Sequence, residues 1–422
     1  MVNYNDLCCE RPSKNNNLIL PIWDKELLDK GSKKSPNYCL LSVFFAFVVG
    51  VSVGVFLPLI HTHSKKPTPI VVVEQSTSSS LILEEGGNGS AYETVSFVDR
   101  ISRTGASVDG NIYWSESVES SLPAGYGRAA HEQWSGYVRG AVGVKLERGC
   151  GRMQNRLVTF QDGTRGCVRY RQNTDQIQGE LFSFFLAQLL GIPNLAPSTV
   201  SVVDLKTPLW SGLSAEIASA QWATNRPIVL TKFIPDLDSS GIPALFRPLE
   251  RHLNRNDVLN VSGDARALVE LAQWSDLIVF DYLTANLDRV VNNLYNYQWN
   301  SNIMEAPAHN LARKLDTDLL VFLDNESGLL HGYRLLDKYE IYHTILLDNL
   351  CMFRKQTADA IRTLKRDGNV GDLLRTMFER TSAAPVRDVL PPLPPKSVKI
   401  LNARIEKVHA QITKCEAIFG DT

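Results

Sequence analysis

The sequence lacks the marks of several common classes of protein. It has 44 Lys and Arg against 45 Asp and Glu, so no basic excess points to a nucleic-acid partner. No Walker loop, dinucleotide-binding glycine motif, His-Glu-x-x-His motif or Gly-x-Ser-x-Gly elbow occurs, and no Cys-x-x-Cys pair suggests a zinc site. No internal repeat is present. What remains is 422 residues of ordinary globular composition, 44% of them hydrophobic, which is enough for one large domain or two.

The N-terminal part of the chain has the pattern of a membrane anchor followed by a stem. Residues 1–37 are polar, and the uncharged run 38–60 is long enough to cross a bilayer as a helix. The run has no small-residue cleavage site, and the lysines just before it outnumber those after it. This predicts an uncleaved type II anchor with residues 1–37 as a cytoplasmic tail. Residues 61–111 have Ser- and Gly-rich stretches and little that could form a core, which predicts a lumenal stem.

The predicted lumenal part has the cysteines and glycosylation sequons of a secretory protein. Its cysteines are an even number, four, which sequence alone allows to pair in three ways. They are Cys150, Cys167, Cys351 and Cys415. Two Asn-x-Ser sequons are candidate glycosylation sites, Asn88 in the stem and Asn260 in the folded part.

From residue 112 onward the pattern mixes strands and helices. Two strands at 156–160 and 165–170 are predicted to meet through a turn at Asp162-Gly163. A helix with one apolar face should follow, capped by Thr174 and ended by Gly191. A further strand is expected at 228–234, and helices at 265–280, 342–364 and 401–419. The fold class predicted is α+β.

One carboxylate on the first predicted helix is a candidate for an ion pair with the strand before it. Glu180 lies at the margin of the apolar face, where an exposed glutamate is the ordinary interpretation. In kinases, however, a glutamate on the helix after the early strands pairs with a basic residue that anchors the ATP phosphates. The preceding strand offers Arg169 for this role.

The most informative stretch is 277–293, read together with 320–328. Phosphoryl transfer needs a carboxylate near the acceptor hydroxyl and oxygen ligands for a divalent metal. Asp288 and Asn293 have the five-residue spacing of the protein-kinase catalytic loop, in which the Asp faces the substrate and the Asn holds metal. Asp324 follows a short apolar run that predicts a buried strand, as the metal-binding Asp of a kinase does.

Several segments, in this order and spacing, resemble the family of secretory-pathway kinases that includes the Golgi casein kinase and the four-jointed proteins. The two most specific are Phe233-Ile-Pro-Asp-Leu237 and Phe280-Asp-Tyr-Leu-Thr-Ala-Asn-Leu-Asp-Arg289. The others are Arg165–Arg171, Gly179–Phe185, Leu323–Glu326 and the cysteine-bearing C-terminal helix. The resemblance covers most of residues 112–422 and leaves the tail and stem unmatched.

The resemblance implies a two-lobed, protein-kinase-like lumenal domain behind one transmembrane helix, with a small lobe at about 112–235 and a large lobe at about 236–422. It implies ATP and Mn or Mg as cofactors, Asp288 as the catalytic residue, and Asp324 as a metal ligand. It also implies that Cys351 pairs with Cys415, which leaves Cys150 for Cys167. The expected substrates are Ser or Thr in cadherin repeats of Fat and Dachsous, phosphorylated in the Golgi lumen or outside the cell in planar polarity and growth control.

Two departures from the family pattern affect the site. The strand lysine that anchors phosphates is Arg169 here, a planar fork in place of a point charge, so Lys145 or Lys232 are alternative anchors. Asn325-Glu326 replaces the Phe-Gly that usually follows the metal-binding Asp, and Glu326 is then a possible extra ligand.

Two other functions stay open on the sequence alone. The first is a non-catalytic binding or signalling protein that keeps a kinase fold. The second is a lumenal glycan kinase, because the wider family also phosphorylates sugar.

Overall fold

The computed structural model describes residues 107–248, 250–261 and 263–420, which belong to one compact unit. The predicted tail, transmembrane run, most of the stem and Asn88 lie outside the described residues. Within those residues, no helix has the length and hydropathy needed to span a membrane. Strand β1 (Val108–Asp109) pairs with β2 (Tyr113–Trp114), so ordered structure begins before residue 112, where the domain was expected to start.

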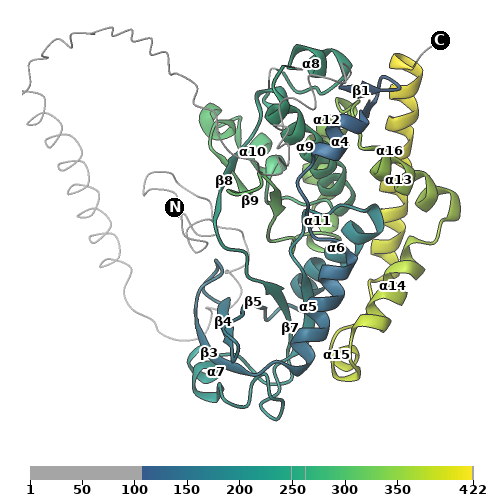
Figure 1. The fold of residues 1–422 in the computed structure, drawn as a ribbon. Coiled ribbons are helices and arrows are strands. Elements are labelled where there is room, and N and C mark those ends of the chain that lie inside the picture. The colour runs from purple at the N-terminus through teal and green to yellow at the C-terminus, as the bar shows by residue number, and fades with distance from the viewer. Residues whose placement is uncertain (1–106, 249, 262, 421–422) are drawn as a thin grey trace, which may run out of the picture. The chain divides into compact units, whose positions relative to one another are not determined.

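A five-stranded antiparallel sheet forms one part of the fold, with the strand order β3-β4-β5-β7-β6 (Figure 1). Its strands β4 and β5 have the predicted bounds, and Gly163 in their connecting turn has a φ of 84°, which glycine adopts without strain. The strands are β3 (Gly143–Arg148), β4 (Arg156–Phe160), β5 (Arg165–Tyr170), β6 (Ser198–Val202) and β7 (Pro227–Lys232).

Helix α6 (Thr174–Leu190) connects the sheet to the helical part. It begins one residue earlier than predicted, because the Asn173 side chain and not Thr174 caps it, and it ends at Gly191 as expected. The prediction of one apolar face was wrong. Helix α6 is buried along most of its length, since the sheet covers one side and α13 (Lys355–Asp367) and α14 (Val370–Thr381) cover the other.

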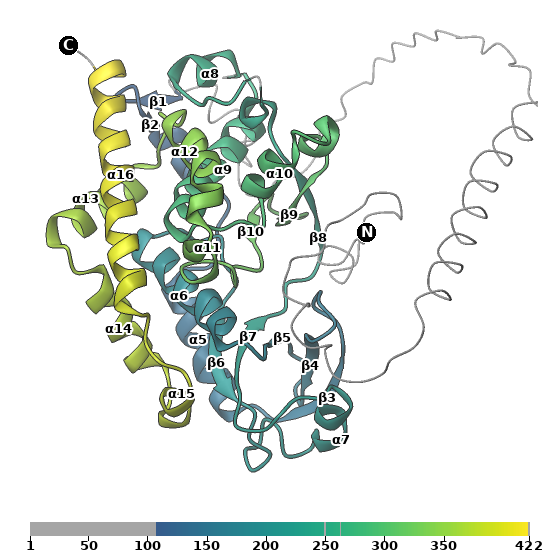
Figure 2. The same ribbon diagram turned by 180° about the vertical axis from the view of Figure 1, so that it is seen from behind.

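The helical part surrounds α9 (Ala265–Thr284), whose C-terminal half is fully buried. A small antiparallel sheet of order β10-β9-β8 lies next to it, and α16 (Pro395–Phe419) runs along the outside (Figure 2). The small strands are β8 (Leu237–Gly241), β9 (Pro307–Lys314) and β10 (Leu320–Phe322). The remaining helices are α4 (Glu116–Ser121), α5 (Arg128–Gly140), α7 (Ser214–Ser219), α8 (Arg255–Asn260), α10 (Val290–Asn296), α11 (His331–Arg334), α12 (Leu336–Asp348) and α15 (Ala384–Val389).

The single helical pattern predicted over 342–364 is two helices in the structure. Helix α12 ends at Asp348 and α13 begins at Lys355. Between them, Leu350 and Phe353 form isolated β-bridges to Leu253 and Tyr113. These long-range backbone contacts interrupt a run whose apolar spacing by itself resembles one helix.

Both expected disulfides are present. Cys150–Cys167 joins the loop between β3 and β4 to strand β5, and Cys351–Cys415 joins the segment before α13 to α16. The sequon residue Asn260 is the last residue of α8 and is exposed, so a glycan there would meet no packed surface.

His131, on α5, gives the stability of the fold a predictable dependence on pH. Burial lowers the pKa of His131 to about 4 from an ordinary 6.5. In the unfolded chain His131 therefore takes up a proton near pH 6.5, whereas in the folded chain it does so only near pH 4. Stability should be full above pH 6.5 and fall on acidification by up to about 3 kcal/mol from this group. Buried His343 acts in the same direction.

We expect His131→Gln to flatten this slope, measured as the free energy of urea unfolding between pH 7 and 4. His252→Gln, at a side chain that is 49% exposed, is the matched control and should keep the wild-type slope. An unchanged slope in His131→Gln would contradict the assignment.

Candidate active site

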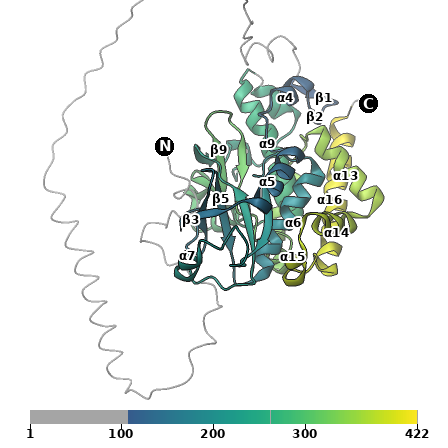
Figure 3. The same ribbon diagram turned by 60° about the horizontal axis from the view of Figure 1, so that its bottom comes forward.

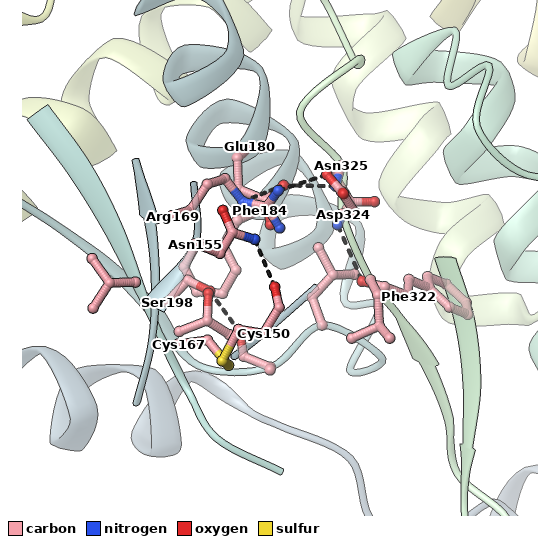
Figure 4. A pocket seen from close by; sticks show the side chains of 15 residues that line it. Cys150, Asn155, Cys167, Arg169, Glu180, Phe184, Ser198, Phe322, Asp324 and Asn325 are labelled. Carbon is pink, nitrogen blue, oxygen red and sulfur yellow. Dashed lines mark hydrogen bonds and ion pairs between the residues drawn. A yellow bond between two sulfur atoms is a disulfide. The ribbon is translucent and has the colours of Figure 1, made fainter. Parts of the chain in front are cut away.

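A small cavity lies where the five-stranded sheet faces β10. Its lining combines the apolar rings of Phe184 and Phe322 with the charged side chains of Arg169, Glu180 and Asp324 (Figure 4). The cavity has a volume of about 30 Å³, which holds little more than water. An aromatic base and its phosphates would need it to widen.

Arg169 is the basic residue in the lining of this cavity and contacts three carboxylates. Its Nη1 donates to Asp324 Oδ1 at 2.7 Å and to Glu326 Oε2 at 3.0 Å. Its Nε lies 3.7 Å from Glu180 Oε2, so the structure brings together the strand arginine and the helix glutamate that the sequence suggested as partners. Glu180 also accepts a hydrogen bond from the backbone N–H of Asn325 at 2.6 Å.

Glu326 is the centre of a larger group of ion pairs. Arg171 Nε donates to it at 2.6 Å, Arg152 Nη1 lies 2.5 Å from it, and the Gln176 amide donates at 3.1 Å. Glu326 and Arg171 are almost completely buried, whereas the Arg152 side chain is 46% exposed. Glu326 is therefore held in place by the loop between β3 and β4, by the end of β5 and by α6, and it cannot move without disturbing buried charges.

Asp288 lies beside the same carboxylates. Its backbone N–H donates to Asn286 Oδ1 at 2.9 Å, and Ser327 hydrogen-bonds to its side chain. Burial raises the pKa of Asp288 above its ordinary value, and the negative charges of Asp324 and Glu326 raise it further. A carboxylate with a raised pKa is suited to proton transfer.

The pKa shifts of the other two carboxylates reflect the same balance of charges. Burial opposes the ionised form of Asp324, but Arg169 and Arg152 outweigh it, and the pKa is lowered. At Glu180 burial dominates over Arg169, and the pKa is raised.

Arg289 holds the loop of Asp288 against the loop of Asp324. It is completely buried and forms an ion pair with Asp281 on α9. Its Nη2 donates to the carbonyl oxygen of Leu323 at 2.9 Å and to Asn325 Oδ1 at 2.5 Å. The two loops, 36 residues apart in sequence, are thereby joined through one guanidinium group.

The carboxylates and amides of this region are the ligand types that Mn²⁺ and Mg²⁺ take in proteins. Glu180, Asp288, Asp324 and Glu326 supply four negative charges against three positive ones from Arg152, Arg169 and Arg171. The excess of acid fits a cation. In the described part of the chain, though, no three His, Cys, Asp or Glu side chains converge as metal ligands, because arginines lie between the carboxylates.

Asn293, the third residue of the predicted metal set, lies on α10. Its amide donates to the carbonyl oxygen of Ile303 at 3.3 Å, and its buried Oδ1 has no hydrogen-bond partner among the described residues. An oxygen left without a donor is available to a cation, and Asn293 remains a predicted ligand.

A family model for the four-jointed box protein middle domain matches residues 129–418. The chain belongs to the four-jointed box family. The Drosophila melanogaster protein named extracellular serine/threonine protein kinase four-jointed is 53% identical over an alignment of 358 residues, and the match covers 73% of this chain and 61% of the fly protein. Human four-jointed box protein 1 is 38% identical over 322 residues, 75% of this chain and 72% of the human protein.

Two solved structures share a more distant likeness. The Golgi casein kinase with Mn/ADP bound has 12% identity and a TM-score of 0.44, over 68% of this chain and 76% of that one. Hydra Fam20 with sugar has 13% identity and a TM-score of 0.48, over 71% of this chain and 94% of that one.

In this member of the four-jointed box family, the sequence did not predict that Arg152 and Arg171 bind Glu326 together with Arg169. Arg171 ends a segment that carries the family resemblance, but nothing in its spacing shows that it turns inward. Arg152 follows a glycine-bearing loop by one residue. The sequence shows only that each is a basic residue a few positions after a cysteine. Arg152 follows Cys150 and Arg171 follows Cys167, and these two cysteines form a disulfide.

Gly179 lets α6 approach the loop that follows Asp324. A Cβ at this position would lie 2.4 Å from the Glu326 carbonyl oxygen and 2.9 Å from that of Gly328. We expect Gly179→Ala to push the loop away and to lower the free energy of unfolding by about 1–3 kcal/mol.

The matched control is Gly136→Ala on α5, where a Cβ meets nothing within 4 Å. That change should stabilise the protein by about 0.5–1 kcal/mol, since alanine favours a helix interior. Urea unfolding of both variants measures the difference, and equal effects of the same sign would refute the close approach.

Proposed function

We propose that this protein is a kinase that transfers the γ-phosphate of ATP to serine or threonine in extracellular proteins. The observation that carries the proposal is the meeting of Asp288 and Asp324, from two distant loops, in one cluster of carboxylates beside the small cavity. Membership of a family whose fly relative is named an extracellular serine/threonine kinase supports it. The chain matches only 61% of that relative's length, and the activity is proposed here for the chain itself.

Each residue of the cluster has a proposed role. Asp288 orients the acceptor hydroxyl and takes its proton. Asp324 and Glu326, with Asn293, are the residues that would hold Mn²⁺ or Mg²⁺. The bound cation would neutralise charge on the phosphates. Arg169, positioned by Glu180, would bind the phosphates, which is the role of the usual strand lysine.

Binding of nucleotide requires the cluster to rearrange. Arg169 Nη1 donates to Asp324 Oδ1 at 2.7 Å, so the proposed phosphate-binding side chain occupies an oxygen of the proposed metal ligand. Phosphate oxygens offer Arg169 the same charge-assisted hydrogen bonds as Asp324 does, so the exchange conserves its pairing. We infer that ATP binding moves Arg169 from Asp324 to the phosphates.

A second candidate function has an observation in its favour. The arginines satisfy the carboxylates without any ligand, and the 30 Å³ cavity has no room for a base. If this state never opens, the protein is a binding or signalling protein without catalysis. The glycan-kinase alternative has no such observation.

We further propose cadherin repeats as the substrates and the Golgi lumen as the site of action, with a type II anchor at residues 38–60. Two disulfides among the described residues support a secretory compartment. The family resemblance supports the choice of substrate.

The test is transfer of labelled γ-phosphate by the full chain with Mn or Mg. The acceptors are a secreted cadherin-repeat protein, a secreted protein without such repeats, and a panel of glycans. The proposal predicts label on serine or threonine of the cadherin repeats. Label only on sugar would establish the glycan kinase, and no label on any acceptor despite ATP binding would establish the binding protein.

A further inference from the structure

A second cavity, the rear cavity, shares the lining residues Phe184 and Ser198 with the small cavity beside Asp324. It has a volume of about 310 Å³ and lies between strand β6 and the helices α5, α6 and α14, which gather on one side of the sheet in Figure 3. This volume is at the lower end of the range for small-molecule sites, and about ten times that of the cavity beside Asp324.

The walls of this rear cavity are apolar and aromatic, and its rim is basic. The apolar side chains are Leu181, Phe184, Phe185, Leu189, Leu373 and Met377. Arg128, Arg139 and Arg380 line it as exposed side chains, against the single carboxylate of Glu132. None of these four forms an ion pair within the residues that the structure describes, so the rim keeps an uncompensated positive charge.

A buried acceptor provides an independent sign of a ligand. His131 lines the cavity, is only 7% exposed, and packs edge-on against Phe184 with ring centroids 4.6 Å apart. Its Nδ1 has no hydrogen-bond partner among the described residues. A buried polar atom without a partner costs free energy, which a ligand hydroxyl in the cavity would recover.

We propose that the rear cavity binds a single-chain amphiphile with an anionic head group. The acyl chain would lie against the apolar walls, and the head group would meet the arginines of the rim. A fatty acid and a lysophospholipid share this chemistry. The lysophospholipid also has a hydroxyl group, which can donate a hydrogen bond to His131 Nδ1.

Occupancy of the rear cavity should oppose nucleotide binding, a step that rests on the proposed kinase function. Phe184 is a wall of both cavities. The 30 Å³ cavity must widen to admit a base, and the rear cavity is the empty space into which Phe184 can turn. An acyl chain in that space would hold Phe184 in place.

Photolabelling of the full chain tests the binding site without reference to activity. The probe is a palmitate carrying a diazirine, and mass spectrometry maps the labelled residues. We expect label on α5, α6 or α14, competed by palmitate and by lysophosphatidate but not by the neutral alcohol of the same chain length or by an alkylamine. Stronger competition by lysophosphatidate would assign the natural source to lysophospholipid, and stronger competition by palmitate would assign it to fatty acid.

Variants at the cavity sharpen the test. Thr376→Trp, at an exposed lining position, should fill the cavity and abolish the label. Arg128→Glu with Arg380→Glu should weaken competition by palmitate at least about fivefold. Arg375→Glu lies on the same helix outside the lining and should change nothing. Label outside these helices, or equal competition by the neutral alcohol, would overturn the site.

Two further results decide the remaining points. A photoreactive side chain at Thr376 that crosslinks to another part of the chain or to a second copy would replace the amphiphile as occupant. Saturating palmitate should weaken ATP binding at least about fivefold. Unchanged ATP affinity would overturn the coupling alone, and a chain that takes the label but binds no ATP would overturn the kinase function together with the coupling.

Discussion

Replacing Asp288 with Asn is expected to lower the rate of phosphate transfer by about 10²–10⁴-fold while the protein stays folded. Asparagine has the shape of aspartate but cannot take a proton from the acceptor hydroxyl. The pKa of Asp288 is raised by burial and by repulsion from Asp324 and Glu326, so a neutral side chain there relieves more unfavourable charge than the attraction to Arg152 that it loses. The measurement is the initial rate of γ-phosphate transfer at saturating ATP.

Asp388→Asn is the matched control, because Asp388 is exposed on α15 and takes no part in the cluster. It should transfer phosphate at the wild-type rate. A fall of less than about tenfold in Asp288→Asn would remove Asp288 from the catalytic role, given the usual magnitude of proton-transfer catalysis.

Replacing Arg289 with Met should lower the free energy of unfolding by about 3–5 kcal/mol. The change leaves Asp281 as a buried carboxylate without a counter-charge, and it removes the guanidinium donor from the carbonyl oxygens of Leu323 and Asn310. Even with Arg289 present, burial raises the pKa of Asp281 to about 6 from an ordinary 3.8. Arg289 lowers this pKa, so in Arg289→Met it should rise further, and the loss should shrink as the pH falls toward 6, where the buried carboxyl takes up a proton.

Urea unfolding measures the loss, with Arg366→Met as control. Arg366 also pairs with an aspartate, its neighbour Asp367, but its side chain is 71% exposed, so the expected change is within about 0.5 kcal/mol. The double variant of Arg289→Met with Asp281→Leu should lose less than Arg289→Met alone, because no charge is left buried. A loss of the same small size at Arg289 and Arg366 would contradict the joining role.

The sequence was most informative where the chemistry is local. The alternation and the Asp162-Gly163 turn placed β4 and β5 to the residue, because strand period and turn type are set by neighbours. The catalytic-loop spacing and the strand before Asp324 brought out two carboxylates that the fold does place in one cluster. A family resemblance, and no spacing rule, chose among the three disulfide pairings.

Long-range packing is what the sequence could not predict. Glu180 was placed at the margin of an apolar face, yet it is buried, because Arg169 on β5 and the loop at Asn325, 145 residues further along the chain, pack against it. The same reason hides Arg171, which pairs with Glu326 across 155 residues. One apolar period over 342–364 likewise gave no sign of the β-bridges that divide it.

The most direct test of the account is metal-dependent phosphate transfer by the full chain beside its Asp324→Ala variant. The claim is that the arginine-filled cluster opens to hold a cation and ATP, with Asp324 as a ligand. It predicts transfer that requires Mn or Mg and that Asp324→Ala abolishes, although the variant remains folded by urea unfolding. Transfer that persists in Asp324→Ala, or that does not need a divalent metal, would contradict it.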